Sequence, residues 1–380
     1  MTQQAPNLIV SIAEAMNPSK RHTMEDVHVT LNPGTWGCND PEMAYIGVYD
    51  GHGGRDTVDF LENALHQNIA QELNMNDNNN GNNDNVNNHD KNNNHDVDVN
   101  VNASTHVKIE RAFLMTDVQS QMSGIQISGA TVAICLIKKH SNGKKITIHS
   151  ANAGDGRAVL SCQPTSLSRN EYESSSSDQN NNNNNPSSSS EPPTKKLKEQ
   201  PTQRRQSSRC RKLIPKAHRL TCDHKADNID EIKRIESSGG FLLRNRVLGI
   251  MAVARSLGDH GMKEYVIGRP FIDTVEIDLE LLNDGKSANH DESDSCNNSE
   301  SGNDSDSDAL KDEFVILACD GLWDTMEDQE AVDLVRKYVK HGSIRESERM
   351  NYKEGAAKML CKRALQLGST DNITVIVAWL

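Results

Sequence analysis

The chain has 380 residues, of which 25% are charged and 35% hydrophobic, and its formal net charge is −13 at pH 7. This acidity argues against a broad affinity for nucleic acid. No apolar run approaches the ~20 residues of a membrane-spanning helix, and residues 1–20 lack the pattern of a signal peptide. The eight cysteines form no Cys-x-x-Cys pair, so no zinc site is indicated. We therefore expect a soluble intracellular protein that binds neither a membrane nor a specific nucleic acid.

Three tracts are too polar to help build a core. Residues 76–102 are mostly Asn and Asp, residues 165–212 are rich in Ser, Asn, Pro and basic residues, and residues 283–312 are rich in Ser, Asp and Asn. Such tracts bury too little apolar surface to offset the entropy of ordering them, so we predict disordered loops. The remainder suffices for one domain. Residues 1–380 are therefore interpreted as a single domain with three disordered insertions.

The second tract also carries a dense positive charge. Residues 195–212 contain eight Lys or Arg and one Glu in an otherwise acidic chain. Such clusters are typical of nuclear-import signals and of segments that dock acidic partners, although a solubilising linker is the simpler alternative. On the first interpretation we expect the protein in both cytoplasm and nucleus.

Hydrophobic spacing predicts the secondary structure between the tracts. In chain order, the pattern predicts a strand over 43–50, helices over 57–73 and 107–122, strands over 128–137, 145–151 and 157–162, a strand near 218–221, a helix over 229–237, strands over 247–253, 271–277 and 314–319, helices over 328–339 and 355–367, and a strand over 373–380. Strands and helices do not alternate regularly, which disfavours a doubly wound parallel sheet. The order favours an α+β fold with a central antiparallel β-sandwich flanked by helices.

Acidic residues stand beside apolar strands at several places. They are Glu25 and Asp26 in RHTMED, Asp50 in YDGHGG, Asp155 in NAGDGR, Asp320 in ACDG and Asp371 in STDN. A carboxylate at a strand end is held rigidly, and several converging carboxylates stay charged only if cations neutralise them. Mg²⁺ or Mn²⁺, which prefer oxygen ligands, suit such a site. Gly51 would let its backbone carbonyl approach as a further ligand.

Each of these motifs alone is more typical of a structural feature than of a catalytic one. An Asp-Gly pair after a strand is usually a turn. His52 alone would be a loop histidine, and Arg21 alone would be a surface charge. The joint order and spacing of the motifs favour the catalytic interpretation over the structural one.

The motifs together resemble those of the metal-dependent type 2C serine/threonine protein phosphatases, and most of all the short fungal type. In family order, the matching segments are RHTMEDVH (21–28), YIGVYDGHGG (45–54), SGATVA (128–133), ANAGDGRAVL (151–160), LTCDHK (220–225), EIKRIESSGGFL (231–242), AVARSLGD (252–259), EFVILACDGLWDTM (313–326) and STDNITVIV (369–377). The resemblance implies a PP2C-like β-sandwich, phosphorylated protein substrates and a monomer. It also implies that the flap bordering the substrate cleft lies at residues 226–248.

The resemblance also implies roles for single residues. The metal ligands would be Glu25, Asp50, the Gly51 carbonyl, Asp320 and Asp371 for two Mg²⁺ or Mn²⁺ ions, and Asp155 with Asp324 for a weaker third. Asp50 would bridge the two metals. Arg21 would hold the substrate phosphate, and His52 would protonate the leaving oxygen. Asp26 and Asn372 would orient metal-bound waters.

The implied reaction is direct attack on phosphorus by a hydroxide that bridges two metals, without a phosphoenzyme. Other enzyme classes are disfavoured, because the sequence lacks Cys-x5-Arg, the GDxHG and GNHE motifs, and GxxxxGK[ST]. A pseudophosphatase is disfavoured because every ligand carboxylate is present. A scaffold whose polar tracts carry the function remains an alternative. By analogy with the fungal type, we expect a negative regulator of kinase signalling that acts on a stress-activated MAP kinase.

Overall fold

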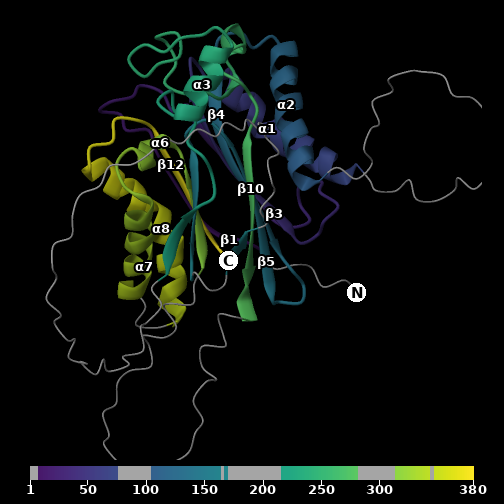
Figure 1. Cartoon of the computed structure of the whole chain (residues 1–380). Coiled ribbons are helices and arrows are strands. Elements are labelled where there is room, and N and C mark those ends of the chain that lie inside the picture. Colours follow the sequence, from purple (N-terminus) through teal and green to yellow (C-terminus); the bar gives the residue numbers. More distant parts are fainter. Residues whose placement is uncertain (1–6, 76–103, 164–166, 170–214, 281–312, 343–345) are drawn as a thin grey trace, which may run out of the picture.

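A computed structural model describes residues 7–75, 104–163, 167–169, 215–280, 313–342 and 346–380 (Figure 1). The predicted insertion at 76–102 and the basic stretch 195–212 lie outside these ranges, as do residues 283–312. One correction concerns the second tract. Its residues 167–169 form a strand that pairs with the strand at 271–278. The start of this tract therefore contributes to the fold.

Two antiparallel sheets form the centre of the molecule. In the described residues, the first sheet has the order β1 (Ile9–Ala15), β12 (Ile373–Trp379), β11 (Phe314–Ala318), β6 (Arg157–Cys162) and β8 (Lys216–Arg219). The second has the order β2 (Asp26–Leu31), β3 (Met43–His52), β4 (Gly129–Lys139), β5 (Lys145–Ala153), β10 (Phe271–Asp278) and β7 (Leu167–Arg169), with β9 (Leu257–Gly258) paired to β4. The predicted antiparallel α+β architecture is thus confirmed.

Helices cover the outer face of each sheet (Figure 1). The elements are α1 (Asp56–Asn74) and α2 (Thr105–Met122) beside the second sheet, α7 (Asp328–Gly342) and α8 (Glu346–Gln366) beside the first, and α6 (Asp320–Trp323), α3 (Ile229–Ser237) and the 3-10 turn at His260–Met262 near one end of the strands. The chain thereby forms four layers in the order helix, sheet, sheet, helix. No helix in the described ranges is both long and apolar enough to cross a bilayer.

The central strands are buried on both faces because each sheet packs against helices and against the other sheet. On β3, Tyr45 and Tyr49 pack with α1 and α2, whereas Ile46 and Val48 point into the space between the sheets. This explains why β3, β4 and β11 are almost continuously apolar rather than alternating. Strand ends at such a rigid double layer give fixed positions for functional side chains.

Two predicted elements need correction here. The predicted strand at 247–253 is instead a series of turns with isolated bridges. Leu248 and Gly249 have positive φ angles, and Ile250 is exposed, so an apolar composition did not produce a strand here. Helix α8 begins at Glu346 rather than residue 355. Gly355 lies inside this helix, where a Cβ would lie 2.6 Å from the Tyr338 hydroxyl, so the close contact between α7 and α8 accounts for the glycine.

Strands β1 and β2 were not predicted at all, and β8 begins two residues before the predicted 218–221. In β1, residues such as Val10 and Ile12 pack between the sheets, while Ile9 and Ala13 pack toward α8. Because both faces carry apolar residues, the alternation that identifies a half-exposed strand is weak. Strand β2 matters for function, because it begins at Asp26.

Candidate active site

Two acidic residues lie opposite each other in the second sheet. Asp26 begins β2 and Asp50 lies near the end of β3, and the strand register pairs the two residues directly. Carboxylate oxygens of both acids and the Cys319 sulfur all lie within 4.8 Å of one another. The Asp26 Oδ2 atom accepts hydrogen bonds from Thr374 Oγ1 at 2.7 Å and from Cys319 Sγ at 3.3 Å. Asp26 is therefore fixed by the opposite sheet.

Asp320 and Asp371 reach the same place from the first sheet. Asp320 follows β11 and Asp371 precedes β12, and these neighbouring antiparallel strands bring the two positions together. The backbones approach closely here, because a Cβ on Gly321 would lie 1.9 Å from the carbonyl oxygen of Asn372. A glycine is therefore required at this point.

Asp155 enters the cluster from the turn between β5 and β6. Its side chain is buried. The preceding Gly154 has φ 116°, and a Cβ there would lie 2.3 Å from the Thr131 Cβ atom. The tight turn between the two sheets thus depends on this glycine and directs the Asp155 carboxylate inward. Five carboxylates from five separate segments consequently act on one another.

The electrostatics of the cluster fit cation binding. Burial raises the pKa of Asp50 well above its ordinary value, and the charges of Asp26, Asp320, Asp155 and Asp371 raise it further. Burial also raises the pKa of Asp26 to about 7, of Asp320 to about 6 and of Asp155 to about 8. The Oδ1 atoms of Asp26 and Asp320 are buried without a hydrogen-bond partner. Unpartnered carboxylate oxygens in a negative cluster are the donors that Mg²⁺ and Mn²⁺ prefer.

Asn372 fastens the segment that carries Glu25. Its Oδ1 atom accepts the Glu25 N–H at 2.9 Å, and its Nδ2 atom donates to the carbonyls of Met16 at 2.8 Å and Thr23 at 3.0 Å. The Glu25 carbonyl in turn accepts the Gly51 N–H at 3.2 Å. Glu25 and Gly51 are therefore adjacent, as the predicted ligand set requires. The water-orienting roles of Asp26 and Asn372 stay predictions.

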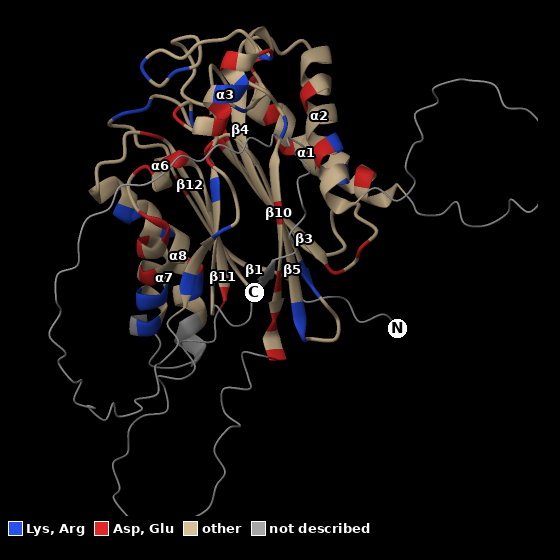
Figure 2. Cartoon of the chain, viewed as in Figure 1, with Lys and Arg blue, Asp and Glu red and all other residues tan. Residues whose placement is uncertain are grey.

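Arg21 and His52 lie at the rim of the carboxylate cluster. The Arg21 guanidinium forms an ion pair with Asp371 and donates through Nε to the Thr370 carbonyl at 3.3 Å. Its side chain is 47% exposed, so it remains accessible to a ligand. His52 is partly exposed and bonds through Nε2 to Asp259 Oδ2 at 2.8 Å. A guanidinium that contacts Asp371 and an imidazole two positions after Asp50 are thus available to a phosphate ester. Figure 2 shows acidic positions, in red, gathered at the end of the strands near α6 and β12.

The two acids assigned to a third metal are joined by a lysine. The Lys225 ammonium lies 2.5 Å from Asp324 Oδ1 and 3.9 Å from Asp155 Oδ2. Asp324 itself is 54% exposed. Lys225 therefore provides a positive charge at this outer position, and the sequence interpretation had given it no role.

A family model described as protein phosphatase 2C matches residues 12–185, 207–282 and 301–373. The chain belongs to this family. Protein phosphatase 2C homolog 1 of Saccharomyces cerevisiae is 26% identical, covering 98% of this chain and 93% of that protein. Protein phosphatase 2C homolog 1 of Schizosaccharomyces pombe is 29% identical, covering 98% and 74%. The crystal structure of serine-threonine phosphatase 2C from Toxoplasma gondii shares the fold, with TM-score 0.56, 14% identity and coverage of 99% and 96%.

Membership of the protein phosphatase 2C family makes this chain a protein serine/threonine phosphatase, and metal-dependent dephosphorylation is the general function of that family. The predicted resemblance to the fungal type is confirmed by the two yeast relatives. The general metal dependence of the family agrees with the cation-binding chemistry of the carboxylate cluster.

Sequence reasoning missed the residues that support the site. Asp259, Lys225, Cys319 and Thr374 all contact predicted site residues. All four stand in quoted motifs, namely AVARSLGD, LTCDHK, EFVILACDGLWDTM and STDNITVIV, so membership of a motif was the available signal. Their partners, however, lie far away along the chain.

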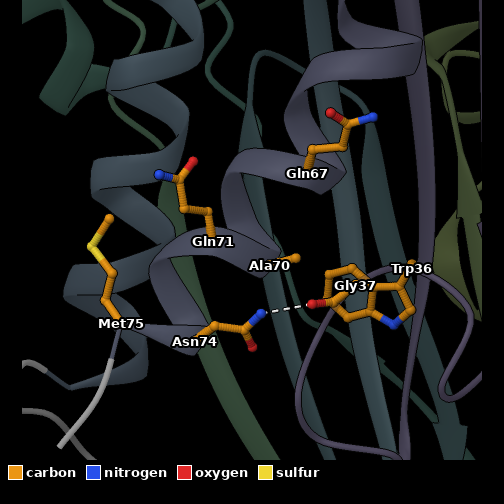
Figure 3. A pocket seen from close by; sticks show the side chains of 7 residues that line it. All are labelled: Trp36, Gly37, Gln67, Ala70, Gln71, Asn74 and Met75. Carbon is orange, nitrogen blue, oxygen red and sulfur yellow. Dashed lines mark hydrogen bonds between the residues drawn. The ribbon is translucent and has the colours of Figure 1, made fainter. Parts of the chain in front are cut away.

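A separate shallow pocket lies at the far end of α1 from the carboxylates (Figure 3). It measures about 490 Å³ and is lined by Trp36, Gly37, Gln67, Ala70, Gln71, Asn74 and Met75. Asn74 donates to the Gly37 carbonyl at 2.6 Å across its edge. None of these described lining residues is acidic or basic, so they do not offer the chemistry of phosphate hydrolysis.

Proposed function

We propose that the carboxylate cluster is the catalytic centre and that it hydrolyses phosphoserine and phosphothreonine in proteins. The observation that carries this proposal is the convergence of Asp26, Asp50, Asp155, Asp320 and Asp371, with buried oxygen atoms left unpartnered. Such a cluster is unfavourable unless cations neutralise it. Glu25, Asp50, the Gly51 carbonyl, Asp320 and Asp371 would hold two Mg²⁺ or Mn²⁺ ions, and Asp155 with Asp324 a weaker third.

Bound divalent cations would supply positive charge and Lewis acidity toward the phosphate and the attacking water. The protein's own residues would bind and orient the substrate. Arg21 presents a planar guanidinium that suits two phosphate oxygens, and it would exchange its contact with Asp371 for the phosphate. His52 would donate a proton to the seryl or threonyl oxygen as the ester bond breaks. Asp26 would hold a water through its unpartnered Oδ1 atom.

The test replaces Asp50, Asp320 and Asp371 singly with Asn. Each change removes one negative charge while keeping the side-chain volume. We expect at least a hundredfold lower kcat/KM for a phosphothreonine peptide and weaker Mn²⁺ binding measured by calorimetry. Asp333→Asn on the outer helix α7 is the matched control, because Asp333 is exposed and bonds only within its helix to Gln329. Unchanged activity and Mn²⁺ binding in all three site variants would refute the proposal.

We further propose that the chain is a single-domain, monomeric enzyme of cytoplasm and nucleus that opposes a stress-activated MAP kinase. Its support is the similarity to fungal phosphatases and the basic stretch 195–212. The direct test compares phosphoproteins in cells with and without the enzyme under osmotic or oxidative stress. We expect the doubly phosphorylated kinase to persist longer without it. Unchanged kinase phosphorylation would remove this substrate from the proposal.

A further inference from the structure

His52 has one hydrogen-bond partner among the described residues, and that partner is a carboxylate from a distant segment. The His52 Nε2 atom lies 2.8 Å from Asp259 Oδ2. The Asp259 side chain is 6% exposed, whereas His52 is 32% exposed. Within the described part of the chain, this arrangement leaves Nδ1 as the ring nitrogen without a partner. A buried carboxylate thus fixes one side of a ring whose other side is available to substrate.

Several contacts hold the Asp259 carboxylate in one orientation. Ser256 Oγ donates to the same Oδ2 atom at 2.5 Å, and the Asp259 N–H donates to the Ser128 carbonyl at 3.0 Å. A Cβ on Gly129 would lie 2.1 Å from Oδ2, so β4 leaves room for the carboxylate only because this residue is glycine. Asp259 itself has φ 49°, a left-handed conformation that is uncommon outside glycine. Such local strain is retained where the surrounding structure enforces it.

The loop that carries Asp259 is anchored by a second, independent ion pair. Asp117 on α2 pairs with Lys263 at 2.9 Å and accepts the Gly258 N–H at 2.8 Å. Lys263 also donates to the Ser256 carbonyl at 2.8 Å. These contacts hold the backbone of the loop without touching His52. Asp117 therefore anchors the backbone of this loop, so the contact of the Asp259 carboxylate with His52 is not needed to hold the loop in place.

We infer that Asp259 is the positioning residue for His52. It sets the ring orientation and keeps the proton on Nε2, so that Nδ1 is the atom that donates to the leaving oxygen. A buried carboxylate also orients the histidine of Ser-His-Asp hydrolases, but there it bonds to Nδ1 and leaves Nε2 for the reaction, so the two ring nitrogens exchange roles here. This inference rests on the general-acid role of His52 proposed above.

In the proposed reaction, His52 gives one proton to the leaving oxygen and later regains one from solvent. Protonated His52 carries hydrogen on both nitrogens, and its Nε2–H donates to Asp259. As the ester P–O bond breaks, its electron pair moves to the seryl or threonyl oxygen, which takes the Nδ1 proton and leaves as the alcohol. Water provides the new oxygen on phosphorus and releases a proton to solvent. The neutral ring keeps its Nε2–H on Asp259 and regains the Nδ1 proton from solvent.

The test compares two substrates in the full chain with saturating Mn²⁺. A phosphothreonine peptide has an alkoxide leaving group that needs a proton, whereas p-nitrophenyl phosphate has a stable phenolate leaving group that does not. For Asp259→Asn we expect kcat for the peptide to fall about tenfold or more, and kcat for the aryl phosphate to stay within about twofold. In a His52→Ala background, Asp259→Asn should cause no further loss for the peptide, because it acts through His52.

Asp117→Asn is the matched control, since it weakens the anchor of the same loop without touching His52. It should lower thermal stability while leaving the ratio of the two kcat values unchanged. Equal losses for both substrates in Asp259→Asn, or a further loss in the His52→Ala background, would show that Asp259 only supports the fold. If His52→Ala discriminates between the substrates and Asp259→Asn does not, the positioning role alone is overturned. If His52→Ala does not discriminate, the general-acid role fails as well.

Discussion

Asp26 and Asp50 are directly paired across β2 and β3, although both are carboxylates at neighbouring positions of one sheet. Two like charges opposite each other destabilise a sheet, and burial adds to the cost. Burial and the nearby acids accordingly raise the pKa of both groups, that of Asp26 to about 7. Cations bound at the cluster, as proposed above, would offset this cost.

The first prediction concerns the stability of the metal-free protein. A raised carboxyl pKa means that the folded state binds more protons than the unfolded state, so stability is lost as pH rises toward the folded pKa. Asp320 at about 6, Asp26 at about 7 and Asp155 at about 8 place this loss between about pH 4 and pH 8. We expect a lower free energy of unfolding at pH 8 than at pH 5, measured by denaturant titration in chelator.

Saturating Mg²⁺ or Mn²⁺ should reverse that trend, because cations stabilise the charged form that they bind. Asp26→Asn, which removes one of the groups, should flatten the dependence on pH in the metal-free protein. A metal-free protein that is more stable at pH 8 than at pH 5 would contradict this description of the cluster.

The second prediction concerns Arg21. Its guanidinium is accessible and already contacts Asp371. It can therefore reach a phosphate bound to cations at the same acids. Arg21→Ala should raise KM for a phosphopeptide more than it lowers kcat, because the contact is made in both ground and transition states. Steady-state kinetics on one peptide give both constants. A change in kcat alone would assign Arg21 to the transition state instead.

The third prediction concerns Lys225. Its ammonium lies between Asp155 and Asp324, where a third cation would bind, so the two positive charges compete. Lys225→Met should increase the affinity of the weakest Mn²⁺ site, as measured by calorimetry or by Mn²⁺ resonance. Lys233→Met, a change on the exposed face of α3, should leave all Mn²⁺ affinities unaltered. Weaker Mn²⁺ binding in Lys225→Met would show that the lysine supports the site rather than competing for it.

The sequence identified the acids that the structure brings together, because they lie in short motifs beside strong apolar strands. Asp50 lies near the end of β3 and Asp320 follows β11, and burial on both faces makes these two strands easy to recognise. The sequence could not predict the pairing of His52 with Asp259, because a contact across 207 positions depends on how β4, β9 and the following loop pack. The turns at 244–249 were missed because Arg244 and Asn245 adopt positive φ angles without a glycine that would have indicated a turn.

The fourth prediction concerns the tract at 76–102. The described ends on either side are close, because Lys108 Nζ donates to the Met75 carbonyl at 3.1 Å. A short Gly-Ser linker can therefore join α1 to α2, and loop length changes the closure entropy only slightly, by about 0.6 kcal/mol per doubling. We expect kcat/KM for a phosphopeptide to stay within about twofold of the full chain. A folded but inactive deletion variant would favour a scaffold or regulatory role for the tract.

The most direct test of the account is the metal dependence of hydrolysis. The purified full chain is assayed on phosphoserine and phosphothreonine peptides after treatment with excess chelator, and again after Mg²⁺ or Mn²⁺ is restored. Because Asp50, Asp320 and Asp371 carry the proposed cation site, we predict that turnover falls to background in chelator and returns with either cation. Full turnover in excess chelator would contradict the assignment of the carboxylate cluster as the catalytic centre.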